Sequence, residues 1–527
     1  MRTLKPLFLQ RILISFALFC LVLLIPFCVS YADDGFQASD KYKLNSISAT
    51  SDMLANYAVS QYGEQTVESL AKLIRFNTVA VDGLTPDTNP EFIKFKLQLK
   101  RLSEQLGLDY ADHGYVVLIG LGESERKLGI ITHGDVQPAD PKLWHKSPYE
   151  LDITTTPGLL IGRGTEDDKG PIVTAMYAMK AIKDKGLSLD RRIELMVYMA
   201  EESDWGPLKA FLKGFTPADI NITIDAEYPV VTAEKGWSEI RFLIPNSETG
   251  IEATGPSLLT FSGGSFASQV PQQATATLIN IDANLLEKIK QRSELQRGMR
   301  YQFISDGDKL TIMADGKSVH SSTPEDGVNA VTHLAAILAG FSWPKNQASL
   351  TQSFISQMIG LGVYAELFGD IAYSDDFMGK MTLAPTVVNS TEKGAEVVMN
   401  LRRPLGKSAE LLERQTQEAL KEWQQAHGVT LQQVETYWGE PKLMDKAPHL
   451  TTLLSVFGYF ARVKAPKPIA IGGSTNSKLF PNALSFGPAM PGVEYTGHSE
   501  HEFITHEQFM LNLKMYTAAF VELAVKQ

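Results

Sequence analysis

Short apolar runs alternate with amphipathic helical patterns over much of the first half of this 527-residue chain. Runs at 128–132, 193–199 and 220–224 have the length and composition of buried strands. Between the first two runs, apolar residues recur at helical spacing over 171–186, and the pattern at 91–106 predicts another helix. This alternation predicts an α/β sheet domain whose functional groups lie in loops at the carboxyl ends of strands.

The sequence pattern changes after about residue 236, which indicates a second domain. Residues 237–437 contain several strand-like runs, a glycine-rich stretch and a helical pattern at 408–427. The last part of the chain has a Gly-Gly loop and a final helical pattern, before which Thr505 and Gln508 have capping-box spacing. Because the chain is too long for one compact core, we expect one domain interrupted by another. Residues 33 to about 60 are polar and are expected to form a loosely held arm.

The first 32 residues have the features of a secretory signal peptide. Basic residues precede an uncharged run at 12–29, and Ser30 and Ala32 occupy the −3 and −1 positions of a cleavage site after Ala32. The alternative is an uncleaved membrane anchor, because the run approaches the length that spans a bilayer. We therefore expect an exported protein, periplasmic or secreted. Cys20 and Cys28 both lie in this segment, so a metal site in the cleaved chain would consist of His, Asp and Glu.

The overall charge and composition exclude two classes of protein. A net charge of −11 argues against a nucleic-acid-binding protein, because neutralising phosphates requires an excess of Lys and Arg. With 44% hydrophobic residues, the chain is also too apolar for a largely disordered protein.

One histidine and several acidic residues border the predicted strands and helix. His133 follows directly on a strand, and a carboxylate two residues later, Asp135, suits a metal ligand whose other ring nitrogen is held by an acid. The alternative is a strand-end histidine that makes an ordinary hydrogen bond. Asp167 and Asp168 lie between glycine-rich flanks just ahead of the helix. They are either helix-capping residues or members of a site, since Asp near a helix N-terminus accepts hydrogen bonds from free amides.

Glu201 and Glu202 come immediately after the second strand. Adjacent carboxylates at a buried strand end repel each other unless a cation or a shared proton compensates. One can bind a metal while the other acts as a general base, and the alternative is a solvated acidic loop. Asp225 follows the third strand, and His498, with His501 as its rival, is a further candidate. Five such ligands suit two zinc-like ions that share a bridging carboxylate.

Together these motifs resemble the dinuclear zinc metallopeptidases that include glutamate carboxypeptidase, aminoacylase and peptidase V. The segments that carry the resemblance are His133-x-Asp135-x-x-Pro138, Gly164-Thr-Glu-Asp167-Asp-Lys-Gly-Pro171, Glu201-Glu202, Asp225-Ala-Glu and His498. The resemblance is closest to the peptidase V-like dipeptidases. It is carried by the sequence of residues 162–171 and by Asp225-Ala-Glu-Tyr-Pro with Glu234-Lys-Gly downstream. The resemblance covers nearly all of the chain after residue 32.

This resemblance implies a fold and a metal centre. The fold would be α/β, with a mixed central sheet flanked by helices in a catalytic domain over 33–236 and 438–527, interrupted by an α+β lid domain at 237–437. Two Zn²⁺ ions per chain are implied, with Mn²⁺ or Co²⁺ as substitutes. Their implied ligands are His133 and Asp225 at one ion, Glu202 and His498 at the other, and Asp167 as the bridge. Glu201 would be the general base, and Asp135 would orient the first histidine.

The resemblance also implies substrate-binding residues. In the lid, His320 would reach over the substrate carbonyl, and Arg402 would bind the substrate carboxylate. Gly472 and Gly473 match a glycine loop beside the substrate.

The sequence departs from the family pattern at two places. The family usually has Asn where His501 stands, and its polar residue before Val-Pro in the lid corresponds here to the region of Ser268-Gln269. These changes leave the metal ligands intact and concern fine recognition of the substrate. The length of the lid resembles the monomeric peptidase V arrangement, which predicts a monomer.

These assignments predict an exported metallo-dipeptidase that hydrolyses the peptide bond of dipeptides with a metal-bridging hydroxide and Glu201 as general base. The main alternative is an N-acyl-amino-acid amidohydrolase with the same metals and a different pocket for the N-terminal side. A non-catalytic binding protein of the same fold is disfavoured, because the general base and all five ligands are present. The expected partner is a small peptide, with no nucleic acid and no stable membrane span once the leader is cleaved.

Overall fold

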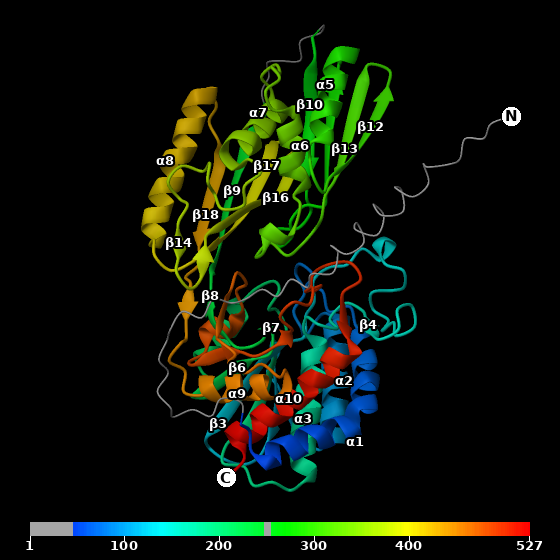
Figure 1. Ribbon diagram of the computed structural model, residues 1–527, viewed down its shortest axis with the longest axis vertical. Coiled ribbons are helices and arrows are strands. Elements are labelled where there is room, and N and C mark those ends of the chain that lie inside the picture. Colours follow the sequence, from blue (N-terminus) through cyan, green and yellow to red (C-terminus); the bar gives the residue numbers. More distant parts are fainter. Residues whose placement is uncertain (1–45, 247–254, 527) are drawn as a thin grey trace, which may run out of the picture. The chain divides into compact units, whose positions relative to one another are not determined.

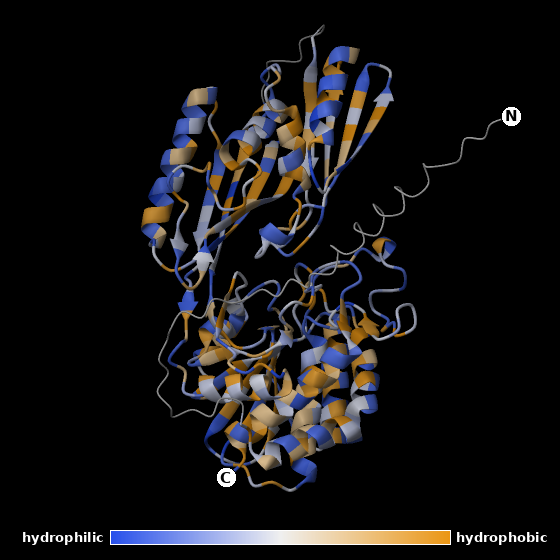
Figure 2. Ribbon diagram, in the orientation of Figure 1, coloured by the Kyte–Doolittle hydropathy of each residue, from blue (hydrophilic) through white to orange (hydrophobic). Residues whose placement is uncertain are grey.

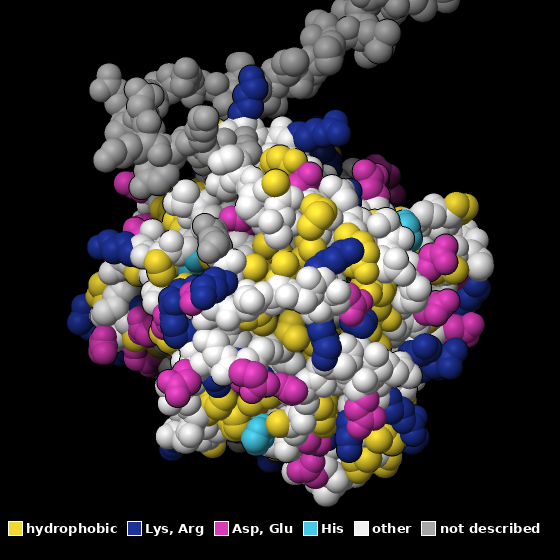
Figure 3. All heavy atoms as spheres, turned by 90° about the horizontal axis from the view of Figure 1, so that it is seen from below, with side chains coloured by type: hydrophobic (Ala, Val, Ile, Leu, Met, Phe, Trp, Pro, Cys, Tyr) yellow, Lys and Arg dark blue, Asp and Glu magenta, His cyan; other side chains and the backbone are white. Residues whose placement is uncertain are grey.

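The structure is a computed structural model that describes residues 46–246 and 255–526 (Figure 1). The predicted signal peptide at 1–32, with both cysteines, lies outside the described residues. Among the helices of the described part, none combines the length and the hydrophobicity that crossing a membrane requires. Figure 3 shows acidic and basic side chains interspersed on the face that it draws.

The first sheet has nine strands and mixed direction. Its order is β1 (Asp109–Asp112), β2 (Val116–Leu121), β5 (Arg192–Tyr198), β3 (Lys127–His133), β6 (Ile220–Thr223), β21 (Ala483–Ser485), β8 (Val231–Glu234) and β19 (Lys442–Leu443), with β20 (Ile469–Ile471) beside β8. Strand β3 is parallel to both β5 and β6, with Ile130 opposite Leu195 and Ile222, whereas β2 is antiparallel to β5. The three predicted strands are therefore neighbours in the centre of this sheet, which confirms the α/β class.

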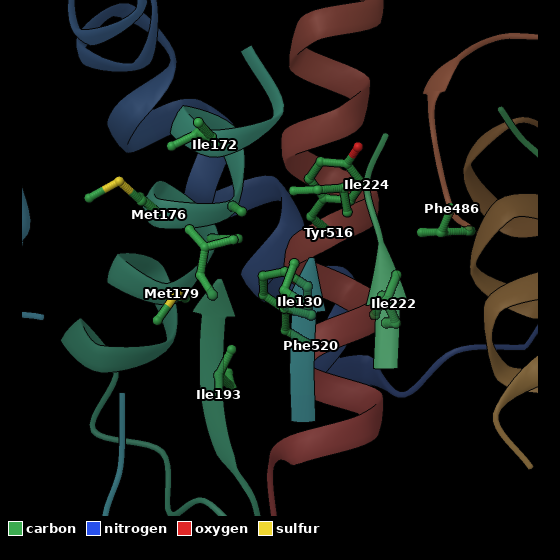
Figure 4. Packing of buried hydrophobic residues seen from close by; sticks show 14 of the residues in the cluster. Ile130, Ile172, Met176, Met179, Ile193, Ile222, Ile224, Phe486, Tyr516 and Phe520 are labelled. Atoms are coloured by element: carbon green, nitrogen blue, oxygen red, sulfur yellow. The ribbon is translucent and has the colours of Figure 1, made fainter. Parts of the chain in front are cut away.

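Helices from both ends of the chain cover this sheet and form a core with it. They are α1 (Ala49–Ile74), α2 (Pro90–Leu106), α3 (Lys169–Asp184), α9 (Leu450–Phe460) and α10 (His506–Ala524). Figure 4 shows Ile130 of β3 next to Phe520 of α10, with Ile222 of β6 on one side and Met176 of α3 on the other. All four side chains are fully buried, so the segments before and after the second sheet share one hydrophobic core.

The prediction of a loosely held arm over residues 33 to about 60 is wrong from residue 49 onward. Helix α1 begins at Ala49, where Ser48 accepts a hydrogen bond from the amide of Ser51. Leu54, Ala55 and Ala58 are fully buried in the core. The apolar face of this part of α1 consists largely of alanine, a weak hydrophobic signal among polar neighbours, although its spacing is helical.

The second sheet is antiparallel throughout and has eight strands. Its order is β12 (Arg300–Asp306), β13 (Lys309–Asp315), β11 (Gln273–Ile279), β10 (Ser257–Gly263), β16 (Thr382–Thr391), β17 (Gly394–Arg403), β9 (Gly236–Pro245) and β18 (Gln432–Trp438). Its helices are α5 (Ala283–Glu294), α6 (Ala330–Leu338), α7 (Gln347–Phe354) and α8 (Ala409–His427). Figure 2 shows hydrophobic and hydrophilic residues alternating along β12, as in a sheet with one solvated face. This sheet has its own core, in which Phe354 packs edge-on against Trp423.

Several short elements fix the loops at one edge of the first sheet. The strand β23 (Phe503–Thr505) pairs with β4 (Leu159–Ile161), and β22 (Pro488–Ala489) pairs with β7 (Ala226–Glu227). The first pair brings the loop after β4, which carries the acidic motif, beside the C-terminal histidine loop. The remaining short elements are α4 (Gly206–Leu212), β14 (Ser374–Asp375), β15 (Gly379–Lys380), a π-helical turn (Ile355–Ile359) and 3-10 turns at Pro141–Leu143, Pro324–Asp326 and Asn476–Leu479.

Candidate active site

Acidic residues and a histidine lie at the carboxyl ends of three parallel strands, at one edge of the first sheet. His133 is the last residue of β3, Glu201 and Glu202 follow β5, and Asp225 follows β6. Because these strands are parallel neighbours, their carboxyl ends meet at the same edge. Asp167 reaches this edge from the turn before α3.

The carboxylate of Asp167 lies between two histidines. Its Oδ1 is 2.9 Å from Nε2 of His133, and its Oδ2 is 2.9 Å from Nε2 of His498. The same nitrogen of His498 is 2.9 Å from Oε1 of Glu202, and Nε2 of His133 is 3.7 Å from Oδ1 of Asp225. The structure therefore brings all five predicted ligands together, as two sets that share Asp167.

This geometry and the charge of the cluster suit bound divalent cations. Two ligands that each lie about 2.1 Å from one Zn²⁺ ion at a roughly tetrahedral angle are about 3 to 3.5 Å apart. The 2.9 Å contacts of Asp167 with His133 and His498 approach this range. Oε1 of Glu202 is buried and has no partner with hydrogen-bond geometry among the described residues. Burial lowers the pKa of His498, but Glu202 and Asp167 outweigh this and raise that pKa to about 10. The crowded carboxylates thus attract positive charge, which a metal ion would supply.

Asp135 contacts both sides of the cluster. Its backbone carbonyl accepts a hydrogen bond of 3.0 Å from Nδ1 of His133, so in the neutral ring the lone pair is on Nε2, the nitrogen that faces Asp167. Its carboxylate lies 3.6 Å from the same Nδ1 and accepts hydrogen bonds of 3.0 Å from the amides of both Glu201 and Glu202. Asp135 therefore fixes the loop that carries the two glutamates as well as the histidine tautomer.

Glu201 lies in this cluster but faces a different partner. Its Oε1 accepts a hydrogen bond of 3.1 Å from the backbone amide of Asn476. Burial raises the pKa of Glu201 well above its ordinary value, and the nearby carboxylate of Asp225 raises it further. A carboxylate with a raised proton affinity that lies beside a metal cluster can accept a proton from water.

Two residues from the second sheet's segment reach this edge. The ring of His320 lies 4.7 Å from that of His498, centroid to centroid. Its Nδ1 accepts a hydrogen bond of 3.1 Å from the amide of Ser322, so the proton of the neutral ring is on Nε2. Burial lowers the pKa of His320 well below its ordinary value, and His498 and Arg402 lower it further. His320 is therefore a neutral donor beside the cluster.

Arg402 is a buried cation whose partners are all neutral. The residue is 4% exposed, and its guanidinium donates to Oδ1 of Asn400 (3.0 Å), Oγ of Ser321 (3.2 Å) and the carbonyl of Gly472 (3.4 Å). No carboxylate within the described ranges forms an ion pair with it. Burial lowers the pKa of Arg402 to about 9, which is the cost of holding a cation without an anion.

The two predicted glycines differ in their surroundings. A Cβ on Gly472 would lie 2.2 Å from the carbonyl oxygen of Ser322, so this close backbone approach requires glycine. A Cβ on Gly473 would meet only the side chain of Ile471. The structure thus explains the glycine at the first position, and nothing in it explains the glycine at the second.

The two departures from the family pattern lie close to the cluster without joining it. His501 accepts a hydrogen bond of 3.0 Å from the amide of His145, and its ring stacks on Trp144. Of these two candidate histidines, only His498 therefore lies in the cluster. Gln269 donates to the carbonyl oxygen of His498, and Ser268 accepts a hydrogen bond from the amide of Ser321.

Glu502 is a residue of this site that sequence reasoning missed. Its buried carboxylate accepts hydrogen bonds from the amides of Gly164, Glu166 and Asp167, and forms an ion pair of 2.9 Å with Arg163. It therefore shapes the turn that presents Asp167. Its sequence context, a run of charged residues and histidines after Gly497, does not distinguish it from its neighbour Glu500.

Comparisons with known proteins agree with this architecture. The model of peptidase family M20/M25/M40 matches residues 129–522. A Beta-Ala-Xaa dipeptidase of Lactobacillus delbrueckii subsp. lactis is 27% identical over 414 residues, which cover 78% of this chain and 84% of that protein. Human carnosine dipeptidase 1 and the dipeptidase Dug1p of Saccharomyces cerevisiae share the fold, each with a TM-score of 0.58 over 90% of this chain and 99% of theirs, at 14% and 15% identity. The chain therefore belongs to peptidase family M20/M25/M40, and it is a metal-dependent peptidase.

Proposed function

We propose that this protein is a dipeptidase that uses two divalent metal ions, Zn²⁺ by preference, to hydrolyse dipeptides with a free C-terminal carboxylate. The observation that carries the proposal is Arg402, a buried cation with only neutral partners that lies in the same site as the acidic cluster. A buried charge without a counter-ion is costly, so a site that retains one is suited to an anion from the substrate.

The position of Arg402 limits the length of the substrate. It donates to Gly472 and Ser321, the latter being the neighbour of His320, whose ring in turn lies beside His498. A carboxylate at Arg402 therefore places the nearest peptide bond close to the cluster. The guanidinium fork can bind both carboxylate oxygens, which orients the substrate as well as attracting it.

The residues present fit two metal ions. His133 and Asp225 would hold one ion, His498 and Glu202 the other, and Asp167 would contact both. When bound, such ions polarise the substrate carbonyl and lower the pKa of water.

The chain's own residues would then move the proton and stabilise charge. Glu201 would accept the proton of the attacking water and pass it to the leaving amine, a role that its raised pKa favours. Nδ1 of His320 accepts a hydrogen bond from the amide of Ser322, so the neutral ring carries its proton on Nε2. This Nε2–H would donate to the oxygen that becomes negative as the carbonyl is attacked. The carboxylate of Asp135 would hold Glu201 in place by accepting a hydrogen bond from the backbone amide of Glu201.

The relatives support a dipeptide as substrate. The bacterial protein whose sequence matches most of this chain is named for dipeptides that begin with β-alanine. The family match spans residues 129–522, which include the five predicted metal ligands and Arg402. Export after cleavage at Ala32 and a monomeric state are further parts of the proposal, and they rest on the sequence alone.

A substrate panel with different metals tests this proposal. Free dipeptides, tripeptides and N-acetyl amino acids would be assayed with the metal-free enzyme after adding Zn²⁺, Mn²⁺ or Co²⁺. We expect activity only with a metal, and faster cleavage of dipeptides than of the other two classes. Faster cleavage of N-acetyl amino acids would show an amidohydrolase instead, and activity that survives complete removal of metal would contradict both.

A further inference from the structure

Tyr495 forms a hydrogen bond with the shared carboxylate of the cluster. Its phenol donates to Oδ2 of Asp167 at 3.0 Å. This oxygen is the one that lies 2.9 Å from His498, whereas Oδ1 faces His133. The phenol therefore acts on one side of the shared carboxylate only.

The loop around Tyr495 is built to hold the ring in this place. A Cβ on Gly497 would lie 2.2 Å from the phenol oxygen and 2.3 Å from the ring carbon that bears it, so the ring packs over a position where no side chain fits. Between them, the amide of Thr496 donates to Glu166 (3.1 Å), and its hydroxyl accepts from the amide of Phe503 (2.9 Å). The backbone that follows Tyr495 is thus held by hydrogen bonds, and residue 497 has no side chain that would displace the phenol.

The two halves of the cluster do not depend equally on Asp167. Around His133, oxygens of both Asp168 and Asp225 lie within 4.8 Å of the ring nitrogen and of each other. On the other half, Oδ2 of Asp167 and Oε1 of Glu202 each lie 2.9 Å from Nε2 of His498. A displacement of Oδ2 should therefore weaken metal binding more at His498 than at His133.

We propose that Tyr495 is a positioning residue that fixes Oδ2 of Asp167 and thereby sets the metal affinity of the half formed by His498 and Glu202. The proposal rests on the two-metal function above. A carboxylate oxygen has two lone pairs, so one can accept the phenol while the other faces an ion. Hydrogen bonds that orient metal ligands commonly change metal affinity about 10- to 100-fold when they are removed.

Zinc titration of Tyr495→Phe tests the proposal, with Tyr437→Phe as a matched control. Tyr437 is an exposed residue of β18, and its replacement also removes one phenol oxygen. Each protein would be stripped of metal and titrated with Zn²⁺ against a chromophoric chelator. In Tyr495→Phe we expect one of the two Zn²⁺ affinities to fall about 10- to 100-fold, and the other to match the wild type. Tyr437→Phe should retain both.

A second variant covers the case in which Tyr495→Phe does not fold. Gly497→Ala keeps the phenol but displaces it, and the same selective loss is expected. Two unchanged affinities in a folded variant, or an equal fall in both, would overturn the proposal. If the wild type binds no Zn²⁺, the two-metal function fails as well. If the wild type binds two Zn²⁺ ions and both affinities are unchanged in Tyr495→Phe, only the role of Tyr495 is refuted.

Discussion

The carboxylate of Glu502 accepts a hydrogen bond of 3.1 Å from the backbone amide of Asp167, across 335 residues of sequence. The same carboxylate pairs with Arg163, whose side chain is 3% exposed. The C-terminal loop therefore supplies the counter-charge and the acceptor that shape the turn before α3. Because this turn presents the shared carboxylate of the cluster, the ion pair of Glu502 and Arg163 contributes both to the stability of the fold and to the geometry of the site.

Replacement of Glu502 should destabilise the protein. Glu502→Gln leaves the guanidinium of Arg163 buried without an anion, and breaking a buried pair from one side costs on the order of 3 kcal/mol. Urea unfolding of the wild type and the variant measures this difference. Glu500→Gln is the control two residues away, and we expect it to change the free energy of unfolding by less than about 0.5 kcal/mol. Equal stability of Glu502→Gln and the wild type would refute the structural role of this pair.

The adjacent glutamates should separate into two roles. Glu201→Gln should lower kcat about 10²- to 10⁴-fold, because it removes the proposed proton acceptor. Its metal content should match the wild type, since Oε1 of Glu201 faces the amide of Asn476 instead of a histidine. Glu202→Gln should lose bound metal, because Oε1 of Glu202 lies 2.9 Å from Nε2 of His498. Elemental analysis of dialysed proteins, together with steady-state kinetics, distinguishes these outcomes. Loss of metal in Glu201→Gln would contradict the assignment.

His449 should make stability depend on pH at a distance from the site. It is 1% exposed, its Nε2 donates to the carbonyl of Asn221, and its buried Nδ1 has no partner among the described residues. Burial lowers its pKa to about 4. Between pH 6.5 and 4 the unfolded chain therefore binds more protons at this residue than the folded chain does. The free energy of unfolding consequently decreases as the pH is lowered from 6.5 to 4, by about 3 kcal/mol in total.

Comparison of unfolding at several pH values checks this effect. His449→Gln retains an N–H donor for Asn221 but cannot titrate, so its stability should fall less than that of the wild type between pH 6.5 and 4. Above pH 7 the pH dependence of the two proteins should be the same. The exposed His506 provides the control, and His506→Gln should follow the wild-type profile. Parallel profiles of His449→Gln and the wild type would show that the residue titrates normally in the fold.

Much of the site could be predicted from the sequence because its groups lie at the ends of regular elements. His133 ends a strand, and Glu201 and Asp225 each follow one; the apolar runs of these strands are visible in the sequence, and the structure places the strands side by side. The helix at 91–106 ends at Gly107 in a left-handed conformation, as its glycine predicts. Local signals of this kind depend on spacing alone.

Other features depend on contacts between distant segments, and no local pattern reports them. Glu502 and Tyr495 act on Asp167 from loops whose position is set by the β4–β23 pair and by packing. The capping box at α10 is only half formed, because Gln508 donates its amide to Thr505 but its side chain to the carbonyl of Pro488. The start of α1 was missed for a different reason, since its buried face consists largely of alanine.

The most direct test of the proposed function compares a free dipeptide with its C-terminal amide. The wild type should prefer the free dipeptide by about 100-fold or more in kcat/KM, because a charge-assisted bond to a buried guanidinium is worth about 3 kcal/mol. In Arg402→Met, which keeps an apolar side chain of similar length, kcat/KM for the free dipeptide should fall to that for the amide. Bound metal should be unchanged in this variant. Equal cleavage of the two substrates by the wild type, or an undiminished preference in Arg402→Met, would contradict the proposal that Arg402 recognises the substrate carboxylate.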